Sequence, residues 1–367
     1  MLLTRRALNR ATLDRQLLLR RDSRAPLAAV THLAGLQAQA PQAPYLGLWS
    51  RLSGFDPAEV SDLITQRRLL RAPVLRSTVH LMTPDDFQSF RPLVQPLMER
   101  VLKTNFPLPG VDLAEVARMA HDLMAEQPRA RAELGTLLAA RWPDADPKSL
   151  AQAATYLVPS VQVPPRGLWR QSGAPRWAAA DAWLAVDEAT AAGREATELL
   201  LLRYLSAFGP ATVNDAQTWS GVTRLREVAE RLDLRHYRGE DGADLLDLPD
   251  IELPDPDTPA PPRFLPEYDN VLLSHSDRRR VIPHDHPIPL LPGNGAMAGF
   301  VLMDGDWNAL WKLDRGTATI TITPFISLDS ATRDDLITEA TSLLTFLAPG
   351  QQADIRILTP DGDGGDG

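Results

Sequence analysis

Apolar side chains recur at helical spacing through the first two thirds of the chain, and short alternating stretches follow each group of helices. Residues 8–20 and 26–36 carry apolar side chains three or four positions apart, which predicts two amphipathic helices. Residues 56–59, Asp-Pro-Ala-Glu, combine an N-cap, a first-turn proline and a capping-box acid, so another helix is predicted to begin there. The stretch 74–82 then alternates apolar and polar side chains, as a half-buried strand does.

The same order of helices followed by strands returns twice, and this self-similarity predicts tandem winged-helix units. The second repeat is predicted to hold three helices and a strand, at residues 112–126, 131–141, 147–157 and 158–163. The third is predicted to hold three helices, at residues 195–208, 212–219 and 222–232. Ser220 and Gly221 supply a tight turn between its last two helices, which is the helix-turn-helix pattern.

The character of the chain changes after an acidic, proline-rich linker at residues 251–262. Four β-rich stretches and one helix at 331–347 follow, and they predict a C-terminal β-rich, barrel-like domain. The expected fold is α+β, mainly α, with three tandem winged-helix units that form a C-shaped channel. The predicted parts are the three winged helices, the linker, the β-rich domain and a disordered tail, at residues 1–110, 111–190, 191–250, 251–262, 263–360 and 361–367.

The composition of the chain excludes several classes of protein. Its 367 residues contain no cysteine, which rules out disulfides, iron–sulfur clusters, zinc thiolates and cysteine nucleophiles. Arginines interrupt the apolar residues at the start, so no secretory signal is expected, and no apolar run of about 18 residues predicts a membrane span. These features favour a cytoplasmic protein, in keeping with a reducing compartment.

The charge of the chain is unevenly distributed. A formal net charge of −9 argues against a nucleic-acid partner, but residues 1–100 hold 14 arginines against 8 acids. Residues 240–257 hold eight acids and no base, so DNA is expected to avoid that face. The basic residues are nearly all arginine, which suits bidentate phosphate contacts, although a GC-rich genome produces the same preference.

The sequence lacks the common motifs for cofactor binding. There is no P-loop, and the nearest dinucleotide pattern, around Gly293 and Gly295, has the wrong spacing, so no nucleotide cofactor is expected. His284 and His286 could act as metal ligands on one side of an extended segment. Three nearby prolines favour a surface loop instead, and neither a metal nor another cofactor is expected. No nucleophile-elbow pattern supports a serine triad.

Two glutamines two positions apart, Gln37 and Gln39, stand in the segment Ala34–Tyr45. This segment resembles the Gln-x-Gln active-site motif of the AlkZ family of winged-helix DNA glycosylases. Supporting patterns follow in the same order along most of the chain, at residues 76–81, 208–211, 219–221, 265–269 and 277–278. The related YcaQ branch looks similar but has an aspartate at the position of Gln39, so the glutamine favours the AlkZ branch.

The spacing of the two glutamines excludes an α-helix as the carrier of one shared site, because positions i and i+2 of a helix point about 200° apart. Gly35 can loosen the preceding helix end, and Pro41 disfavours helical geometry at Ala40. Gln37 and Gln39 are therefore predicted to lie on an extended stretch and to face the same side. On the residues alone, capping of helix carbonyls or exposure to solvent is favoured, and the resemblance shifts the interpretation to catalysis.

The resemblance implies a DNA glycosylase that cuts the N-glycosidic bond of N7-alkylated purines in double-stranded DNA. It also implies unhooking of interstrand crosslinks of the azinomycin type, as DNA repair and self-resistance in producing bacteria. An amide has no useful basicity near neutral pH, so the two glutamine carbonyls are expected to position a water and to face the positive charge developing on the sugar. The lysines Lys103, Lys148 and Lys312 lie far from the glutamines in sequence, so a monofunctional enzyme without lyase activity is expected.

Further residues are candidates for the pocket or for DNA contact. The pocket candidates, for which a place in the core is the favoured interpretation, are His32, Tyr45, Trp49 and His80. The arginines that could clamp phosphates, about half of which are expected to touch DNA, are Arg5, Arg6, Arg10, Arg67, Arg68, Arg71, Arg76 and Arg278. Asn294, between Gly293 and Gly295, is a candidate for a hairpin tip that enters a groove.

Two other function classes remain open from the sequence. A winged-helix transcription regulator would need a symmetric dimer and a recognition helix, for which residues 222–232 offer Arg224 and Arg226. A nuclease would need a carboxylate cluster for two metals, and the sequence offers none. The glycosylase is expected to act as a monomer and to encircle the duplex, because a crosslinked purine is tied to both strands and cannot be flipped out.

Overall fold

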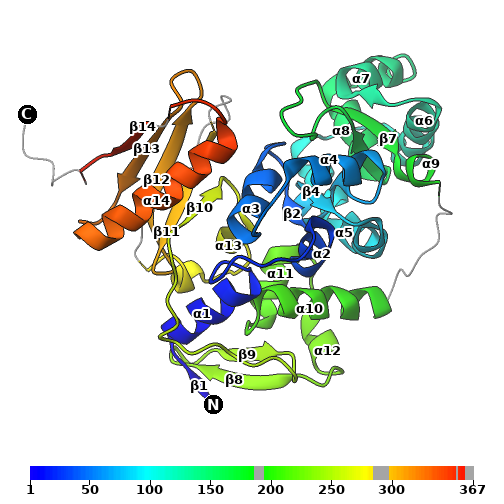
Figure 1. Cartoon of the computed structure of the whole chain (residues 1–367). Helices are drawn as coiled ribbons and strands as arrows, with labels where there is room; N and C mark the ends of the chain where they lie inside the picture. The colour runs from blue at the N-terminus through cyan, green and yellow to red at the C-terminus, as the bar shows by residue number, and fades with distance from the viewer. Residues whose placement is uncertain (186–193, 284–296, 353, 360–367) are drawn as a thin grey trace, which may run out of the picture.

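The computed structural model describes residues 1–185, 194–283, 297–352 and 354–359. Figure 1 shows the β-rich C-terminal part on the left, the helices between residues 57 and 184 at the upper right, and residues 194–247 below, beside the first helix. No helix in these described ranges combines the length and apolar character needed to span a membrane.

The largest sheet joins strands of the first two predicted units. Its order is β2 (Leu36–Gln37), β4 (Val79–Met82), β3 (Leu70–Pro73), β6 (Ser160–Val163), β7 (Arg176–Ala179) and β5 (Arg129–Ala130). β3 and β6 meet through the antiparallel pair Arg71–Gln162, so the two units share one continuous sheet. β2 stands at one edge of this sheet.

Helices from both of the first two predicted units lie next to this sheet in the chain. Those of the first repeat are α1 (Arg5–Arg15), α2 (Pro26–His32), α3 (Ala43–Arg51), α4 (Pro57–Thr65) and α5 (Pro84–Asn105). Those of the second are α6 (Leu113–Glu126), α7 (Arg131–Ala139), α8 (Pro147–Leu157) and α9 (Ala180–Leu184). The side chains of Asp56 and Thr83 accept from backbone N–H groups in the first turns of α4 and α5, and α4 therefore begins where its capping residues predict.

The predicted strand 74–82 is wrong over its first half. The chain instead forms β3, a short 3₁₀ helix η1 (Leu75–Ser77) and then β4. Arg76 and Ser77 have φ angles of 53° and 59°, in the left-handed region that strands exclude. This tight turn reverses the chain and lets β3 and β4 pair antiparallel. The helix predicted at 26–36 likewise ends early, because α2 stops at His32 and residues 36–37 form β2.

A small sheet and three helices make up the third region. Its strands are β1 (Leu2–Leu3), β8 (Arg235–Gly239) and β9 (Asp244–Asp247), with β1 parallel to β8. Its helices are α10 (Arg194–Phe208), α11 (Val213–Ser220) and α12 (Leu225–Ala229). Gly221, with φ of 78°, ends α11 as the turn pattern predicts. α12 is shorter than the recognition helix expected at 222–232, because Arg224 lies outside it in a left-handed conformation.

The C-terminal region is an open sheet rather than the barrel-like domain that was expected. Its strands, in spatial order, are β10 (Arg263–Pro266), β11 (Met297–Met303), β12 (Asp306–Asp314), β13 (Thr319–Pro324) and β14 (Asp354–Ile357). Across the described residues, β10 and β14 form its two edges. The helical segments are α13 (Asn270–Leu273), η2 (Arg278–Arg280) and α14 (Ser330–Leu347). The fold is thus mixed α+β, as predicted.

Helix α3 belongs to two hydrophobic cores. Tyr45 and Leu48 pack into the core that covers one face of the six-stranded sheet. Leu46, on the same helix, packs with Phe264 and Trp311 in the core of the C-terminal sheet. The helix that follows the two glutamines therefore ties the C-terminal region to the first repeat.

Candidate active site

Gln37 and Gln39 lie at the edge of the six-stranded sheet, on a segment that leaves the helical conformation at Ala34 and Gly35. These two residues have φ angles of 53° and 90°, which lets the chain turn out of α2 and enter β2. Gln37 lies in β2, opposite His80 of β4, so its backbone is extended as predicted. Gln37 is 9% exposed, whereas Gln39 is exposed.

The hydrogen-bond ladder of the sheet is interrupted at Ala38, between the two glutamines. The Ala38 N–H donates to the Val79 carbonyl (2.7 Å), as in a regular antiparallel pair. The Ala38 carbonyl instead accepts from Arg71 Nη2 (2.7 Å), and the Val79 N–H donates to Gln39 Oε1 (3.4 Å). The Gln39 side chain thus replaces a backbone acceptor, and this bond fixes which end of its amide faces the sheet.

Arg76 holds the Gln37 side chain from the loop between β3 and β4. Its Nη2 donates to Gln37 Oε1 (2.8 Å), and its Nη1 donates to the carbonyl of Trp219 in α11. Burial, with the nearby charge of Arg278, lowers the pKa of Arg76 to about 10, so the guanidinium stays protonated at neutral pH. A carbonyl oxygen has two lone pairs, so Gln37 Oε1 can accept one further hydrogen bond.

His80, which faces Gln37 across the strand pair, is a neutral imidazole. Burial lowers its pKa to about 3, and the charge of Arg76 acts in the same direction. His80 Nδ1 lies 2.9 Å from the Thr78 carbonyl, which can only accept, so Nδ1 carries the proton and Nε2 carries the lone pair. Within the described residues Nε2 has no hydrogen-bond partner.

Arg71 is the second buried guanidinium beside the glutamines. Burial lowers its pKa to about 10, and its Nε and Nη1 have no hydrogen-bond partner in the part of the chain that the structure describes. Gly167 lies against it, because a Cβ at that position would come within 2.4 Å of Arg71 Nη1. The hydroxyl of Tyr45 donates to the Gly167 carbonyl (2.7 Å) and so holds this loop over the guanidinium.

The C-terminal region reaches the outer edge of β2 through Asn270, a residue that sequence patterns did not single out. Asn270 Nδ2 donates to the Gly35 carbonyl (2.7 Å), and Asn270 Oδ1 accepts from the Gln37 N–H (3.4 Å). The preceding residue, Asp269, forms a buried ion pair with Arg51 of α3, with 2.7 Å between Oδ1 and Nη2. The family pattern at residues 265–269 ends one residue before Asn270, and it was the one signal in the sequence that pointed to this segment.

The segment that carries these contacts falls within a match to a known family. A family model described as DNA glycosylase AlkZ-like matches residues 30–346, which is most of the chain. The chain belongs to the AlkZ-like DNA glycosylase family. Among solved structures, Streptomyces sahachiroi DNA glycosylase AlkZ has a TM-score of 0.81 and 18% sequence identity, covering 98% of this chain and 100% of that one. At this identity the likeness shows a shared fold. A search of curated proteins found no match.

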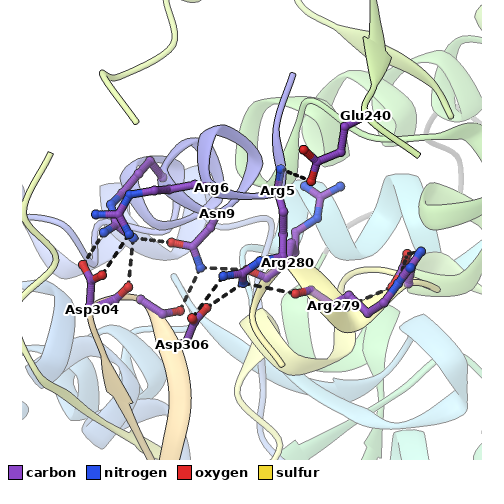
Figure 2. A network of polar contacts seen from close by, with 11 residues as sticks. Arg5, Arg6, Asn9, Glu240, Arg279, Arg280, Asp304 and Asp306 are labelled. Carbon is purple, nitrogen blue, oxygen red and sulfur yellow. Dashed lines mark hydrogen bonds and ion pairs between the residues drawn. The ribbon is translucent and has the colours of Figure 1, made fainter. Parts of the chain in front are cut away.

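Arginines of α1 at residues 5, 6 and 10 are paired with carboxylates of the C-terminal sheet, and Figure 2 shows this network. Arg5 Nη1 lies 2.8 Å from Asp306 Oδ1, and Arg6 Nη1 lies 2.8 Å from Asp304 Oδ2. Arg10 is 1% exposed and also donates to the Asp304 carboxylate. Three of the arginines considered for phosphate contact therefore join α1 to the turn between β11 and β12.

The other candidate arginines lie in different settings. The Arg67 guanidinium stacks 4.2 Å from the ring centroid of Trp183, and Arg68 is exposed. Arg278 lies on η2, close enough to Arg76 for its charge to lower the pKa of Arg76. Arg67 and Arg68 follow α4 in the turn before β3.

The remaining pocket candidates support neighbouring elements. His32 Nε2 lies 2.7 Å from the Arg15 carbonyl, and burial lowers the pKa of this histidine. The Arg21 guanidinium lies over the ring of Trp49, 4.6 Å from the ring centroid. Asn294 and its glycine turn lie outside the described residues, as do His284 and His286. Among the described residues, no three His, Asp or Glu side chains gather as a metal site requires.

Proposed function

We propose that this protein hydrolyses the N-glycosidic bond of N7-alkylated purines in double-stranded DNA, with Gln37 and Gln39 at its chemical centre. Membership of the AlkZ-like family supports a DNA glycosylase. The observation that carries the residue assignment is a pair of neutral amides at one sheet edge, each with its carbonyl oriented by a donor from the protein.

The chemistry of the proposed substrate suits neutral amides. Alkylation at N7 gives the purine a positive charge, so the base departs as a neutral molecule and C1′ becomes oxocarbenium-like. An amide is too weak a base to remove a proton from water near neutral pH, which restricts this site to bonds that are already primed to break. Fixed dipoles that face the developing positive charge supply the stabilisation that such a reaction needs.

Gln37 Oε1 and Gln39 Oε1 are the proposed acceptors for the attacking water. The guanidinium of Arg76 and the Val79 N–H each occupy one lone pair of these oxygens and leave the second available. Because both amides are oriented before substrate arrives, no reorganisation is needed during bond cleavage. Gln39, as the exposed member of the pair, is proposed to meet the DNA first.

The proposed enzyme is monofunctional and leaves an abasic site. A lyase would need an amine to form a Schiff base with the sugar. Lys103, Lys148 and Lys312 lie on α5, α8 and β12, and in the described part of the chain the hydrogen bonds of Gln37 and Gln39 involve none of the three lysines. Treatment with borohydride during excision is expected to trap no covalent adduct with DNA, and a trapped adduct would contradict this assignment.

The proposal extends to interstrand crosslinks of the azinomycin type, and thereby to self-resistance in a bacterium that makes such an agent. A purine crosslinked at N7 is tied to both strands and cannot be rotated fully out of the helix. A site whose outer glutamine, Gln39, is exposed does not require that rotation. The protein should act as a monomer on both an N7-methylguanine duplex and a crosslinked duplex, with products resolved on a denaturing gel. Release from the methylated duplex alone would limit the proposal to simple alkylpurines.

The test of the residue assignment replaces each glutamine by alanine. Gln37→Ala and Gln39→Ala should each lower the single-turnover excision rate about 10- to 100-fold, because a misplaced water loses most of its advantage of position. Binding to undamaged duplex should not change. Gln95→Ala is the matched control, since Gln95 Oε1 also accepts from a buried arginine, Arg91 (2.6 Å), but lies on α5. Unchanged excision in both glutamine variants would refute the assignment.

A further inference from the structure

The outer edge of β2 is completed by a side chain instead of a strand. β2 is the first strand of its sheet, so one side of its backbone has no neighbouring strand. On that side the Gly35 carbonyl and the Gln37 N–H point outward, two residues apart. Asn270 Nδ2 donates to the first (2.7 Å) and Asn270 Oδ1 accepts from the second (3.4 Å). The amide of Asn270 thus takes the place that a backbone peptide group would have in a neighbouring strand.

Asn270 is itself held firmly in place. It is 3% exposed and begins α13, whose N-cap is Asp269. The Asp269 carboxylate accepts from the Val271 N–H (3.1 Å) and forms two bonds of 2.7 and 2.8 Å with Arg51 of α3. Arg51 and Asp269 are almost fully buried, so this ion pair fixes the start of α13 against α3, the helix that follows the glutamines.

We infer that Asn270 is a positioning residue that fixes the backbone of Gln37 and so sets where its amide meets the substrate. This inference rests on the proposed function of Gln37. β4 pairs with β2 from the inner side and also accepts from the Ala38 N–H, whereas Arg76 holds only the far end of the Gln37 side chain. Without Asn270 the two-residue strand would keep a single neighbour, and its Cα positions would be free to shift.

The contact requires an amide. Asparagine offers both an N–H donor and a carbonyl acceptor, whereas an ionised aspartate of the same shape offers acceptors only. In Asn270→Asp the carboxylate would still accept from the Gln37 N–H but would face the Gly35 carbonyl without a proton to share. Asn270→Ser replaces the amide by a smaller side chain with a single hydroxyl. It is the second variant and is used if the aspartate variant does not fold.

Asn9 supplies a matched control. It is 1% exposed, and its Nδ2 donates to the carbonyls of Arg280 (2.7 Å) and Gly305 (2.9 Å). Asn9→Asp therefore also introduces a carboxylate against buried carbonyls, but in α1, which does not contact β2 in the hydrogen bonds described for it, and beside the Arg10 guanidinium, which donates to Asn9 Oδ1 (2.6 Å). The unfolding free energy of each variant is measured alongside, so that its excision rate can be compared with its stability, and a positioning role should lower excision in Asn270→Asp alone.

The experiment measures hydrogen exchange and excision in the full chain. Amide exchange in peptides that contain residues 35–39 should quicken at least tenfold in Asn270→Asp and less in Asn270→Ser, and should match the unmodified protein in Asn9→Asp. Single-turnover excision from an N7-methylguanine duplex should fall about 10- to 100-fold in Asn270→Asp, with unchanged DNA affinity, and stay within twofold in Asn9→Asp.

The two measurements separate the two claims. Equal exchange at residues 35–39 in all variants, or an equal loss of excision in Asn9→Asp and Asn270→Asp, would overturn the positioning role. If the unmodified protein excises no alkylated base, the proposed function fails, while the exchange measurement still decides whether Asn270 holds β2.

Discussion

Two groups of arginines in the first hundred residues look alike in the sequence but have opposite partners in the fold. Arg5, Arg6 and Arg10 of α1 are paired with carboxylates of the C-terminal sheet. Arg71 and Arg76, beside the glutamines, are held by carbonyl oxygens, and among the described residues neither forms an ion pair. The first group is therefore neutralised locally, and the second keeps its charge.

The comparison shows that partners, not the number of arginines, decide which cations keep an unneutralised charge. A buried cation without an anion costs several kcal/mol of desolvation, so its presence needs a compensating role. At the glutamine site the lowered pKa values of Arg71 and Arg76 express that cost. Both arginines also orient polar atoms of the Gln-x-Gln segment: Arg71 bonds the Ala38 carbonyl, and Arg76 bonds Gln37 Oε1. This orientation of the site is the role that offsets the cost of burying the two charges. The following predictions test this distinction.

Replacing Arg10 should have the largest effect on stability. Arg10→Met removes a buried guanidinium that bonds Asp304, the Asn9 side chain (2.6 Å) and the Thr258 carbonyl (2.7 Å). Charged hydrogen bonds of this kind are worth about 2 to 3 kcal/mol together after the losses of desolvation are counted. Denaturant unfolding should show a loss of about 3 kcal/mol, with excision unchanged under conditions where the variant is folded. A large loss of excision in the folded variant would place α1 in the active site. It would contradict the distinction between the ion-paired arginines of α1 and the arginines beside the glutamines.

Replacing Arg76 should affect excision more than stability. Arg76→Met frees the Gln37 amide to rotate, so the single-turnover excision rate should fall about tenfold or more. Arg91 is the matched control, because its guanidinium also bonds one glutamine Oε1 and one backbone carbonyl, at 2.6 Å each. Burial lowers the pKa of Arg91 to about 10 as well.

Arg91→Met should cost a similar amount of stability and leave excision unchanged. Both variants should therefore unfold at similar denaturant concentrations and differ only in rate. Equal excision in the two proteins would mean that the contact between Arg76 and Gln37 is structural alone.

His80 should make the site region sensitive to acid. Its pKa is about 3 in the folded chain and near 6.5 in the unfolded chain, so below about pH 6.5 the unfolded state binds a proton that the folded state excludes. Stability from this residue is thus present above that pH and is lost as the pH falls toward 3. In His80→Leu the dependence between these limits should be shallower by up to about 1.4 kcal/mol per pH unit.

The same measurement can be repeated in Arg76→Met to sharpen the comparison. The Arg76 charge is a cause of the low His80 pKa, so removing it should reduce the acid sensitivity that His80 contributes. His275, which is also buried with a pKa of about 3, provides an unchanged background in both proteins. Removing the charge should raise the pH at which the dependence levels off, and a dependence that ends at the same pH with and without Arg76 would show that its charge does not act on His80.

Replacing Arg5 should have the smallest effect. Its ion pair with Asp306 is partly exposed, with side-chain exposures of 38% and 22%, and such pairs contribute about 0 to 1 kcal/mol. Arg5→Met should therefore shift the unfolding free energy by less than about 1 kcal/mol, and the difference should shrink at high salt. DNA affinity should not change. A fall in affinity would mean that Arg5 contacts DNA phosphates after all.

Local signals in the sequence predicted many helix starts and the extended backbone of Gln37, whereas Gln39 lies in a bend just after β2. Asp56 caps α4 where expected, because a cap depends only on the next three residues, and α11 begins directly after Thr212, the first residue of the helix predicted at 212–219. Gly35 marked the point where the chain leaves α2, and Gln37 is extended there. These features are short-range, so a single sequence contains the information for them.

Contacts between distant segments were not predictable in the same way. Asn270 lies 235 positions from Gly35, and no periodic pattern links the two residues. The left-handed turn at Arg76 and Ser77 was taken for a strand, because neither residue type signals a positive φ. The joining of the first two repeats into one sheet depends on pairing across β3 and β6, which local patterns do not specify. The domain boundaries and the roles of the glutamines stay predictions.

The sharing of α3 between two hydrophobic cores has a consequence for engineering this protein. Leu46 packs against Phe264 and Trp311 while Tyr45, one residue earlier, faces the six-stranded sheet. A chimera that exchanged the C-terminal sheet with that of a relative would have to exchange the matching face of α3 as well. Because α3 begins four residues after Gln39, such grafts would alter the Gln-x-Gln segment even when every residue of it is retained.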